Sequence, residues 1–162
     1  MTQSDLIVMI FDSRQDAPHA RIALEMMRGN HQFGLEHAAE IMRDHSGRML
    51  LHQRMEITQH APHPRSHLPA ALCCALFGHA TEEHHRKLAE AGLDEFFVNS
   101  VSQALAPGRS ALLIFVPHDN ASIDKVALFN AVTLLDGALH RTSVPSEFES
   151  VLLSHMNKDQ EK

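Results

Sequence analysis

The chain has 162 residues, of which 44% are hydrophobic and 21% charged. This composition is typical of one globular domain and excludes a disordered or fibrous protein. The formal net charge is −6, and acidic residues outnumber basic ones in each third of the chain. That balance argues against a nucleic-acid binder, which needs a basic face. The N-terminus lacks a signal-peptide pattern, and the longest apolar stretch, Leu68 to Gly78, is too short to span a bilayer. We therefore expect a cytoplasmic protein.

Residues 4–56 have the pattern of a strand–helix–strand–strand unit. The continuous apolar run Leu6–Phe11 predicts a strand that is buried on both faces. Pro18 suits a first helical turn, and apolar residues then recur at helical spacing up to Met27, with Met26 and Met27 expected to fill the core. A second strand at 35–42 and a returning strand at 49–53 flank a tight turn at 44–47.

Residues 57–91 form an insert that is rich in histidine and proline. Pro62, Pro64 and Pro69 mark a loop at its start. A short apolar helix is expected from Ala70 to Phe77, followed by a polar helix from Thr81 to Gly92.

Residues 92–157 predict an αβαβα unit, followed by a charged tail at 158–162. Asp94 begins a helix, and residues 111–116 form a second apolar strand like the first. Ser122 is the expected N-cap of the next helix, whose buried face carries Val126, Phe129 and Val132. An exit strand at 138–143 and a C-terminal helix from Ser146 complete the unit.

The two strand–helix–strand units predict an α+β fold. We expect a ferredoxin-like split βαβ sheet in a single domain at 1–157, with additional helices between the two halves and at the C-terminus. Both apolar strands should lie centrally in this sheet, because an exposed strand would alternate with polar residues.

Five stretches of the chain carry a family resemblance. They are Ser4-Asp-Leu-Ile-Val, Ser46-Gly-Arg-Met-Leu-Leu-His-Gln53, Gly92-Leu-Asp-Glu-Phe-Phe97, Leu105-Ala-Pro-Gly-Arg-Ser-Ala-Leu112 and Leu139-His-Arg-Thr-Ser143. They resemble a bacterial family catalogued as domain of unknown function 1269, whose members are labelled predicted membrane proteins. The resemblance covers roughly residues 4–56 and 92–156 and implies no activity, substrate or catalytic residue. Family members carry a long Gly-rich apolar segment where this chain has its His/Pro-rich insert, so any membrane contact here is expected to be peripheral, not spanning.

Histidines are concentrated in the insert. Six of the chain's 14 lie between residues 60 and 85, namely His60, His63, His67, His79, His84 and His85. Imidazole binds divalent transition metals, so His60, His63, His67 and His84 are the candidate ligands. The alternative is that these histidines are solvated, because prolines interrupt the segment and no established ligand spacing is present. We therefore predict no cofactor.

Two arginines are candidates for an anion site. Arg109 and Arg141 each sit beside hydroxyl residues, and a guanidinium pairs with carboxylate or phosphate through two hydrogen bonds. The alternative is a turn residue and a solvent-facing strand residue. The adjacent Cys73 and Cys74 are expected to behave as small buried hydrophobes. No nucleophile motif or acid–base pair identifies a catalytic residue.

The sequence therefore favours a non-enzymatic small-ligand-binding or regulatory module that self-associates as a homodimer. Self-association follows from the need to cover the second face of a ferredoxin-like sheet, which the extra helices can also do. Two alternatives remain. One is a metal- or small-molecule-dependent enzyme that uses the His-rich insert, and the other is a protein peripheral to the inner membrane, docking through Leu68–Phe77.

Overall fold

The computed structural model describes residues 3–33, 35, 38–52, 72, 76–77, 81–117, 122–148, 150–152 and 154. These residues form five strands and four longer helices. In chain order they are β1 (Gln3–Phe11), α1 (Asp16–Met27), β2 (Ala38–Arg43), β3 (Met49–His52), α3 (Thr81–Glu90), α4 (Glu95–Ala104), β4 (Ser110–Val116), α5 (Lys125–Thr133) and β5 (Ala138–Pro145).

The strands form one open sheet with the order β3-β2-β4-β1-β5, and all neighbouring strands are antiparallel. The two apolar strands are neighbours inside this sheet, with Ile7 of β1 opposite Ile114 of β4. The predicted α+β class and the central position of both apolar strands are therefore confirmed. Their lack of polar alternation has a simple cause, since every residue of β4 and all but the first of β1 are buried.

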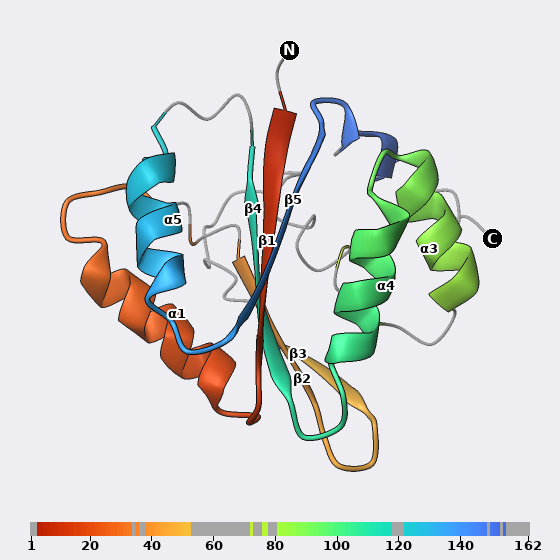
Figure 1. Ribbon diagram of the computed structural model, residues 1–162, viewed down its shortest axis with the longest axis horizontal. Coiled ribbons are helices and arrows are strands. Elements are labelled where there is room, and N and C mark those ends of the chain that lie inside the picture. The colour runs from red at the N-terminus through yellow and green to blue at the C-terminus, as the bar shows by residue number, and fades with distance from the viewer. Residues whose placement is uncertain are drawn as a thin grey trace, which may run out of the picture.

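Helices cover both faces of the sheet, as Figure 1 shows with the sheet seen nearly edge-on. On one face α1 and α5 pack against a cluster that includes Ile7, Met9 and Ile114. On the other face α3 and α4 pack against a cluster that includes Leu6 and Phe115. Successive side chains along each strand point to opposite faces of the sheet, so they contribute alternately to the two cores. Because α3 and α4 cover the second face within the same chain, that face needs no second copy.

The predicted turn at 44–47 is confirmed as the β2–β3 connection. The Asp44 carboxylate accepts hydrogen bonds from the backbone N–H groups of Ser46 (3.0 Å) and Arg48 (2.8 Å), and Gly47 has a φ of 89°. The hydrogen bond from the Ser46 hydroxyl is the largest cause that lowers the pKa of Asp44 below its ordinary value. On the same strand pair, the Arg43 guanidinium donates to the carbonyls of Leu105 and Phe77, both at 3.0 Å.

Several predicted boundaries and faces are wrong in detail. Strand β2 begins at Ala38 instead of residue 35. The N-cap of α5 is Asp124 instead of Ser122, and the Asp124 carboxylate accepts a hydrogen bond from the N–H of Ala127 at 3.1 Å. Val126 is 72% exposed, since α5 buries Leu128, Ala131 and Val132. Met26 is also exposed, because α1 turns Ala20 and Leu24 toward the sheet.

The remaining predicted helices are described in part. Phe148 and Leu152 are buried as expected, and residues 148, 150–152 and 154 have helical backbone. Of the predicted helix at 70–77, residues 72, 76 and 77 are helical, and the others lie outside the described residues, as do Cys73 and Cys74.

Candidate functional site

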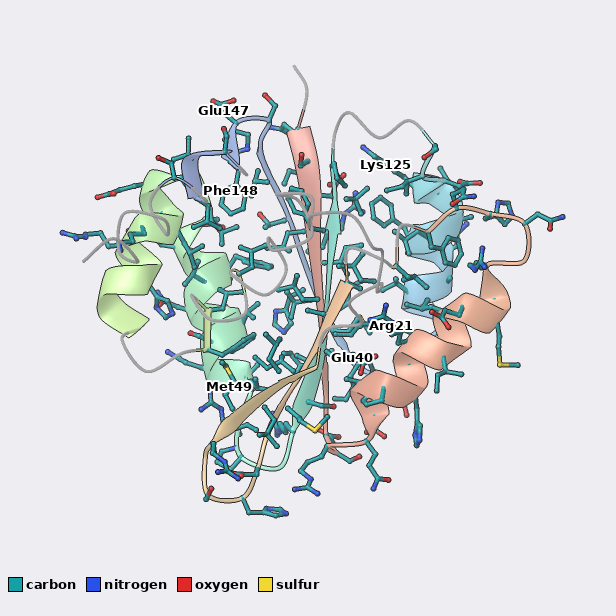
Figure 2. All side chains as sticks on the ribbon, turned by 180° about the vertical axis from the view of Figure 1, so that it is seen from behind. Arg21, Glu40, Met49, Lys125, Glu147 and Phe148 are labelled. Atoms are coloured by element: carbon teal, nitrogen blue, oxygen red, sulfur yellow. The ribbon has the colours of Figure 1, made fainter. Side chains whose placement is uncertain are left out.

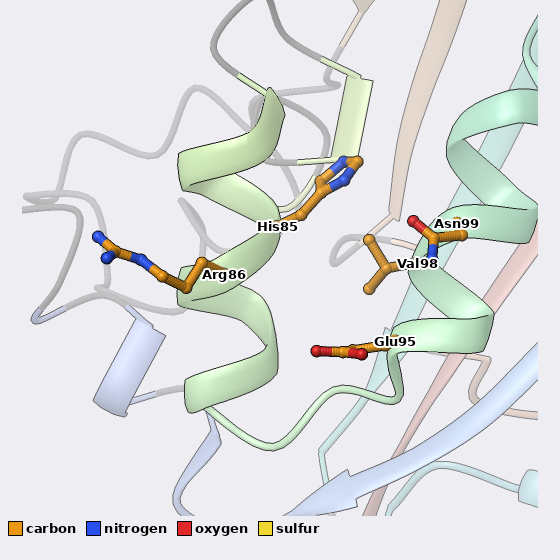
Figure 3. Close-up of a pocket in the computed structure, with 5 residues that line it drawn as sticks. All are labelled: His85, Arg86, Glu95, Val98 and Asn99. Atoms are coloured by element: carbon orange, nitrogen blue, oxygen red, sulfur yellow. The ribbon is translucent and has the colours of Figure 1, made fainter.

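A cavity of about 350 Å³ lies between α3 and α4 (Figure 3). Helix α3 contributes His85 and Arg86 to its lining, and α4 contributes Glu95, Val98 and Asn99. Its size lies at the lower end of the range for small-molecule sites. Among the described residues these five side chains therefore define the candidate site.

The turn between the two helices fixes the shape of this cavity. Gly92 ends α3 with a φ of 111°, and the N–H groups of Gly92 and Leu93 donate to carbonyls of the last turn, at Ala89 (3.0 Å) and Leu88 (2.9 Å). These are the two hydrogen bonds of a Schellman motif. Asp94 then caps α4 by accepting a hydrogen bond from the N–H of Phe96 at 3.1 Å. The Schellman motif at Gly92 and the N-cap at Asp94 thus determine how α3 and α4, and with them the lining residues, are oriented toward each other.

The polar part of the lining offers both hydrogen-bond acceptors and donors. The Nε2 atom of His85 lies 3.2 Å from the Leu76 carbonyl oxygen, so a neutral ring donates from Nε2 and keeps Nδ1 as an acceptor. Figure 3 shows the Glu95 carboxylate extending toward α3, whereas Arg86 extends away from α4. Within the described part of the chain, the side chains of Glu95 and Asn99 have no hydrogen-bond or ion-pair partner.

This lining can hold a small ligand through polar and apolar contacts. Val98 is buried and gives the cavity an apolar wall, while the carboxylate, imidazole and amide offer acceptors for N–H or O–H groups of a ligand. None of the five described lining residues carries a nucleophilic hydroxyl, thiol or amine.

The structure brings together none of the predicted metal ligands in its described part. His60, His63, His67 and His79 lie outside the described residues, and His84 lies on α3 with its side chain outside them. Among the described residues, no group of three or more histidine, cysteine, aspartate or glutamate side chains has the geometry to hold a metal ion. Of the six clustered histidines, His85 is the one with a described side chain, and it lines the cavity.

The two candidate arginines are far apart. Arg109 directly precedes Ser110, which pairs with Phe11, whereas Arg141 pairs with Ile7. Ile7 and Phe11 are four positions apart on β1, which corresponds to about 13 Å. Arg109 donates to the Ala104 carbonyl at 3.1 Å and lies 4.0 Å from Asp12, as a turn residue would. The two arginines therefore lie at different places on the sheet, and each stays a separate candidate.

Sequence patterns missed the residues that complete these sites. Glu95 and Asn99 are ordinary polar residues of an amphipathic helix, and only the neighbouring α3 places them in a cavity. Lys125 lies near Arg141 through their common ion-pair partner Asp5, although 120 residues separate Asp5 from Lys125. The sequence signal for this group was Asp5, an acidic residue directly before the apolar run Leu6–Phe11.

No family model, curated protein or solved structure matches this chain. The resemblance to domain of unknown function 1269 thus stays a prediction. None of the helices in the described part of the chain combines the length and the apolar character needed to cross a bilayer.

Proposed function

We propose that the protein is a non-enzymatic module that binds a small polar ligand in the α3–α4 cavity. The observation that carries this proposal is that Glu95 and Asn99 of α4 line one cavity together with His85 of α3. Glu95 and Asn99 lie in the cavity lining without a side-chain partner among the described residues, next to the His85 ring.

The lining indicates the chemical class of the ligand. A small primary amine fits best, because an ammonium group pairs with the Glu95 carboxylate and its remaining N–H groups can donate to Asn99 and His85. A short apolar portion would lie against Val98.

Thermal unfolding in the presence of small primary amines, diols and amides tests this proposal. A ligand at 100 times its Kd stabilises the folded state by about 2.7 kcal/mol. For a chain of this size that free energy raises Tm by about 5–10 °C. We expect a saturable rise with amines and a much smaller one with diols and amides.

Two variants make the experiment specific. Glu95→Gln keeps the shape of the side chain and removes its charge, so it should abolish the rise with amines. Glu90→Gln changes the same charge at an exposed α3 position outside the lining and should leave the rise intact. The same loss in both variants, or no saturable rise with any compound, would contradict the proposal.

We also propose that the sheet follows the ferredoxin-like plan, extended by β3. The strand order supports this, because the four strands β2, β4, β1 and β5 place one strand between each helix-connected pair. Helix α1 connects β1 to β2, and α5 connects β4 to β5.

We propose that self-association uses the edge strand β5. Its eight residues have a strand neighbour on one side only among the described strands, and Leu139 is exposed on it. An antiparallel edge can pair with a second copy of itself about a twofold axis. We expect a dimer in light scattering that Leu139→Lys converts to a monomer. A monomeric wild-type mass at all concentrations would refute this interface.

A further inference from the structure

A basic pair lies on the opposite face of the sheet from the α3–α4 cavity. It consists of Lys125, the first residue of α5, and Arg141 of β5. In the register of the sheet, Asp5 pairs with Ser143 and Ile7 with Arg141, which places Asp5 and Arg141 on the face that α1 and α5 cover. Figure 2 shows Lys125 at the start of α5 on this side.

Asp5 lies between the two cations. Its Oδ2 atom is 3.7 Å from Nζ of Lys125, and its Oδ1 atom is 3.7 Å from Nη2 of Arg141. The Ser143 hydroxyl donates to Oδ1 at 3.3 Å. The Asp5 side chain is 12% exposed, whereas Lys125 and Arg141 are 37% and 48% exposed. The carboxylate is thus a fixed inner group, and the two cations extend outward from it.

One carboxylate cannot neutralise both cations. The three groups together carry a formal charge of +1, in a chain whose net charge is −6. Both 3.7 Å contacts are longer than a hydrogen bond, so the ammonium and guanidinium keep N–H donors for another acceptor. The position of Lys125 is not explained by helix stability either, because a cation in the first turn opposes the helix dipole.

Arg141 is held in a defined orientation. Its guanidinium carbon lies 3.8 Å from the centre of the Phe129 ring. This stacking covers one face of the guanidinium and leaves its edges, where the N–H groups lie, for in-plane contacts. The planar guanidinium edge, a fork of two parallel N–H donors, is held in place in this way and suits an acceptor with two oxygens.

We propose that Lys125 and Arg141 form a binding site for a small oxyanion, a phosphate or a carboxylate group, with Asp5 and Phe129 as positioning residues. The site takes the oxyanion through the edge of the Arg141 guanidinium and the Lys125 ammonium. Asp5 keeps the two cations close together, and Phe129 sets the plane of the fork. This site is independent of the α3–α4 cavity and of the amine proposed there.

Amide NMR shifts test the site in the full chain, with inorganic phosphate and acetate titrated separately at constant ionic strength. We expect saturable shifts confined to the start of α5 and to β5 around Arg141. Arg141→Gln and Lys125→Gln should each weaken phosphate binding about tenfold, because each removes a charge-assisted hydrogen bond. Arg141→Lys keeps the charge but loses the fork, and should weaken binding by a smaller factor. Saturation with only one of the two anions identifies which oxyanion the site prefers.

Arg48→Gln is the matched control. Arg48 lies in the β2–β3 turn, 3.6 Å from Asp44, and its loss changes the net charge by the same amount. It should leave phosphate binding unchanged. Equal weakening by Arg48→Gln and Arg141→Gln would show non-specific attraction and overturn the proposal, as would shifts that do not saturate. Spectra of each variant without anion verify the fold, and the two charge-removing variants on different elements keep the test valid if one of them unfolds.

Discussion

The contact between Arg21 and Glu40 is the most unusual interaction in the described core. Their side chains are 6% and 5% exposed, and they connect α1 to β2 (Figure 2). Arg21 donates from Nη2 to the Leu35 carbonyl at 3.0 Å. Its Nε atom lies 3.8 Å from Oε1 of Glu40 and 3.9 Å from Oε1 of Glu25, and Nε and Nη1 have no hydrogen-bond partner among the described residues. A buried cation is therefore neutralised by charge but incompletely hydrogen-bonded.

Removing either member of this pair should destabilise the protein strongly. Two unit charges at the observed separation attract by about 4 kcal/mol at an effective dielectric constant of about 20. Breaking a buried pair costs about 3–5 kcal/mol, since the remaining charge stays out of water and loses the attraction of the removed charge. The long contacts put Arg21→Met near the lower limit, at about 3 kcal/mol, which corresponds to a fall in Tm of about 6–12 °C.

Replacing both members should restore most of that stability. In Arg21→Met/Glu40→Leu no charge of the pair remains buried, and the two unsatisfied nitrogens are gone, so we expect stability within about 1 kcal/mol of the wild type. Urea unfolding of the wild type, both single variants and the double variant measures the coupling. Glu25→Gln is the control, because Glu25 is partly exposed and its ion pair should be worth less than about 1 kcal/mol. A double variant as unstable as the sum of the singles would refute this reasoning.

Three further predictions concern local features. Gly92→Ala should lower the free energy of unfolding by about 1–3 kcal/mol, because φ is 111° and a Cβ would lie 2.7 Å from Pro145. The control Gly29→Ala, whose Cβ would have no atom within 4 Å, should lower it by less in the same urea experiment. Asp94→Ala should lower Tm through loss of about 1 kcal/mol of capping free energy, and an unchanged Tm would show that the α3–α4 turn does not need the cap. Desolvation lowers the pKa of His140 in the folded state below its ordinary value of 6.5. As the pH falls, the unfolded chain therefore binds this proton before the folded one does, and the free energy of unfolding should decrease below about pH 6.5. His140→Gln should reduce the loss of urea resistance between pH 7.5 and 5.5, and an identical pH dependence in both proteins would contradict that assignment.

The sequence alone determined the features that depend on neighbouring residues. The strand Leu6–Phe11 could be predicted because an unbroken apolar run has no polar face to expose, and β1 is indeed central. The turn at 44–47 and the start of α4 at Asp94 could be predicted because their hydrogen bonds join residues two to four positions apart. The α+β class follows from the order of such elements along the chain.

The tertiary structure alone decided which face of each helix is buried. Helix α5 is apolar on more than one side, so a stripe through Val126 and Phe129 fits the helical period as well as one through Leu128 and Val132. Packing against the sheet selects the second stripe.

The candidate sites also depend on the tertiary structure. The α3–α4 cavity needs His85 and Glu95 to face each other across a turn, and the basic pair needs residues 5, 125 and 141 to meet at one end of the sheet. Nothing in the local sequence separates Arg141 from Arg109, which has a similar neighbourhood of hydroxyl residues. Hydrogen bonds and hydrophobic periodicity act over a few residues, whereas an ion pair between distant residues exists only after strand pairing has fixed the register that brings their charges together.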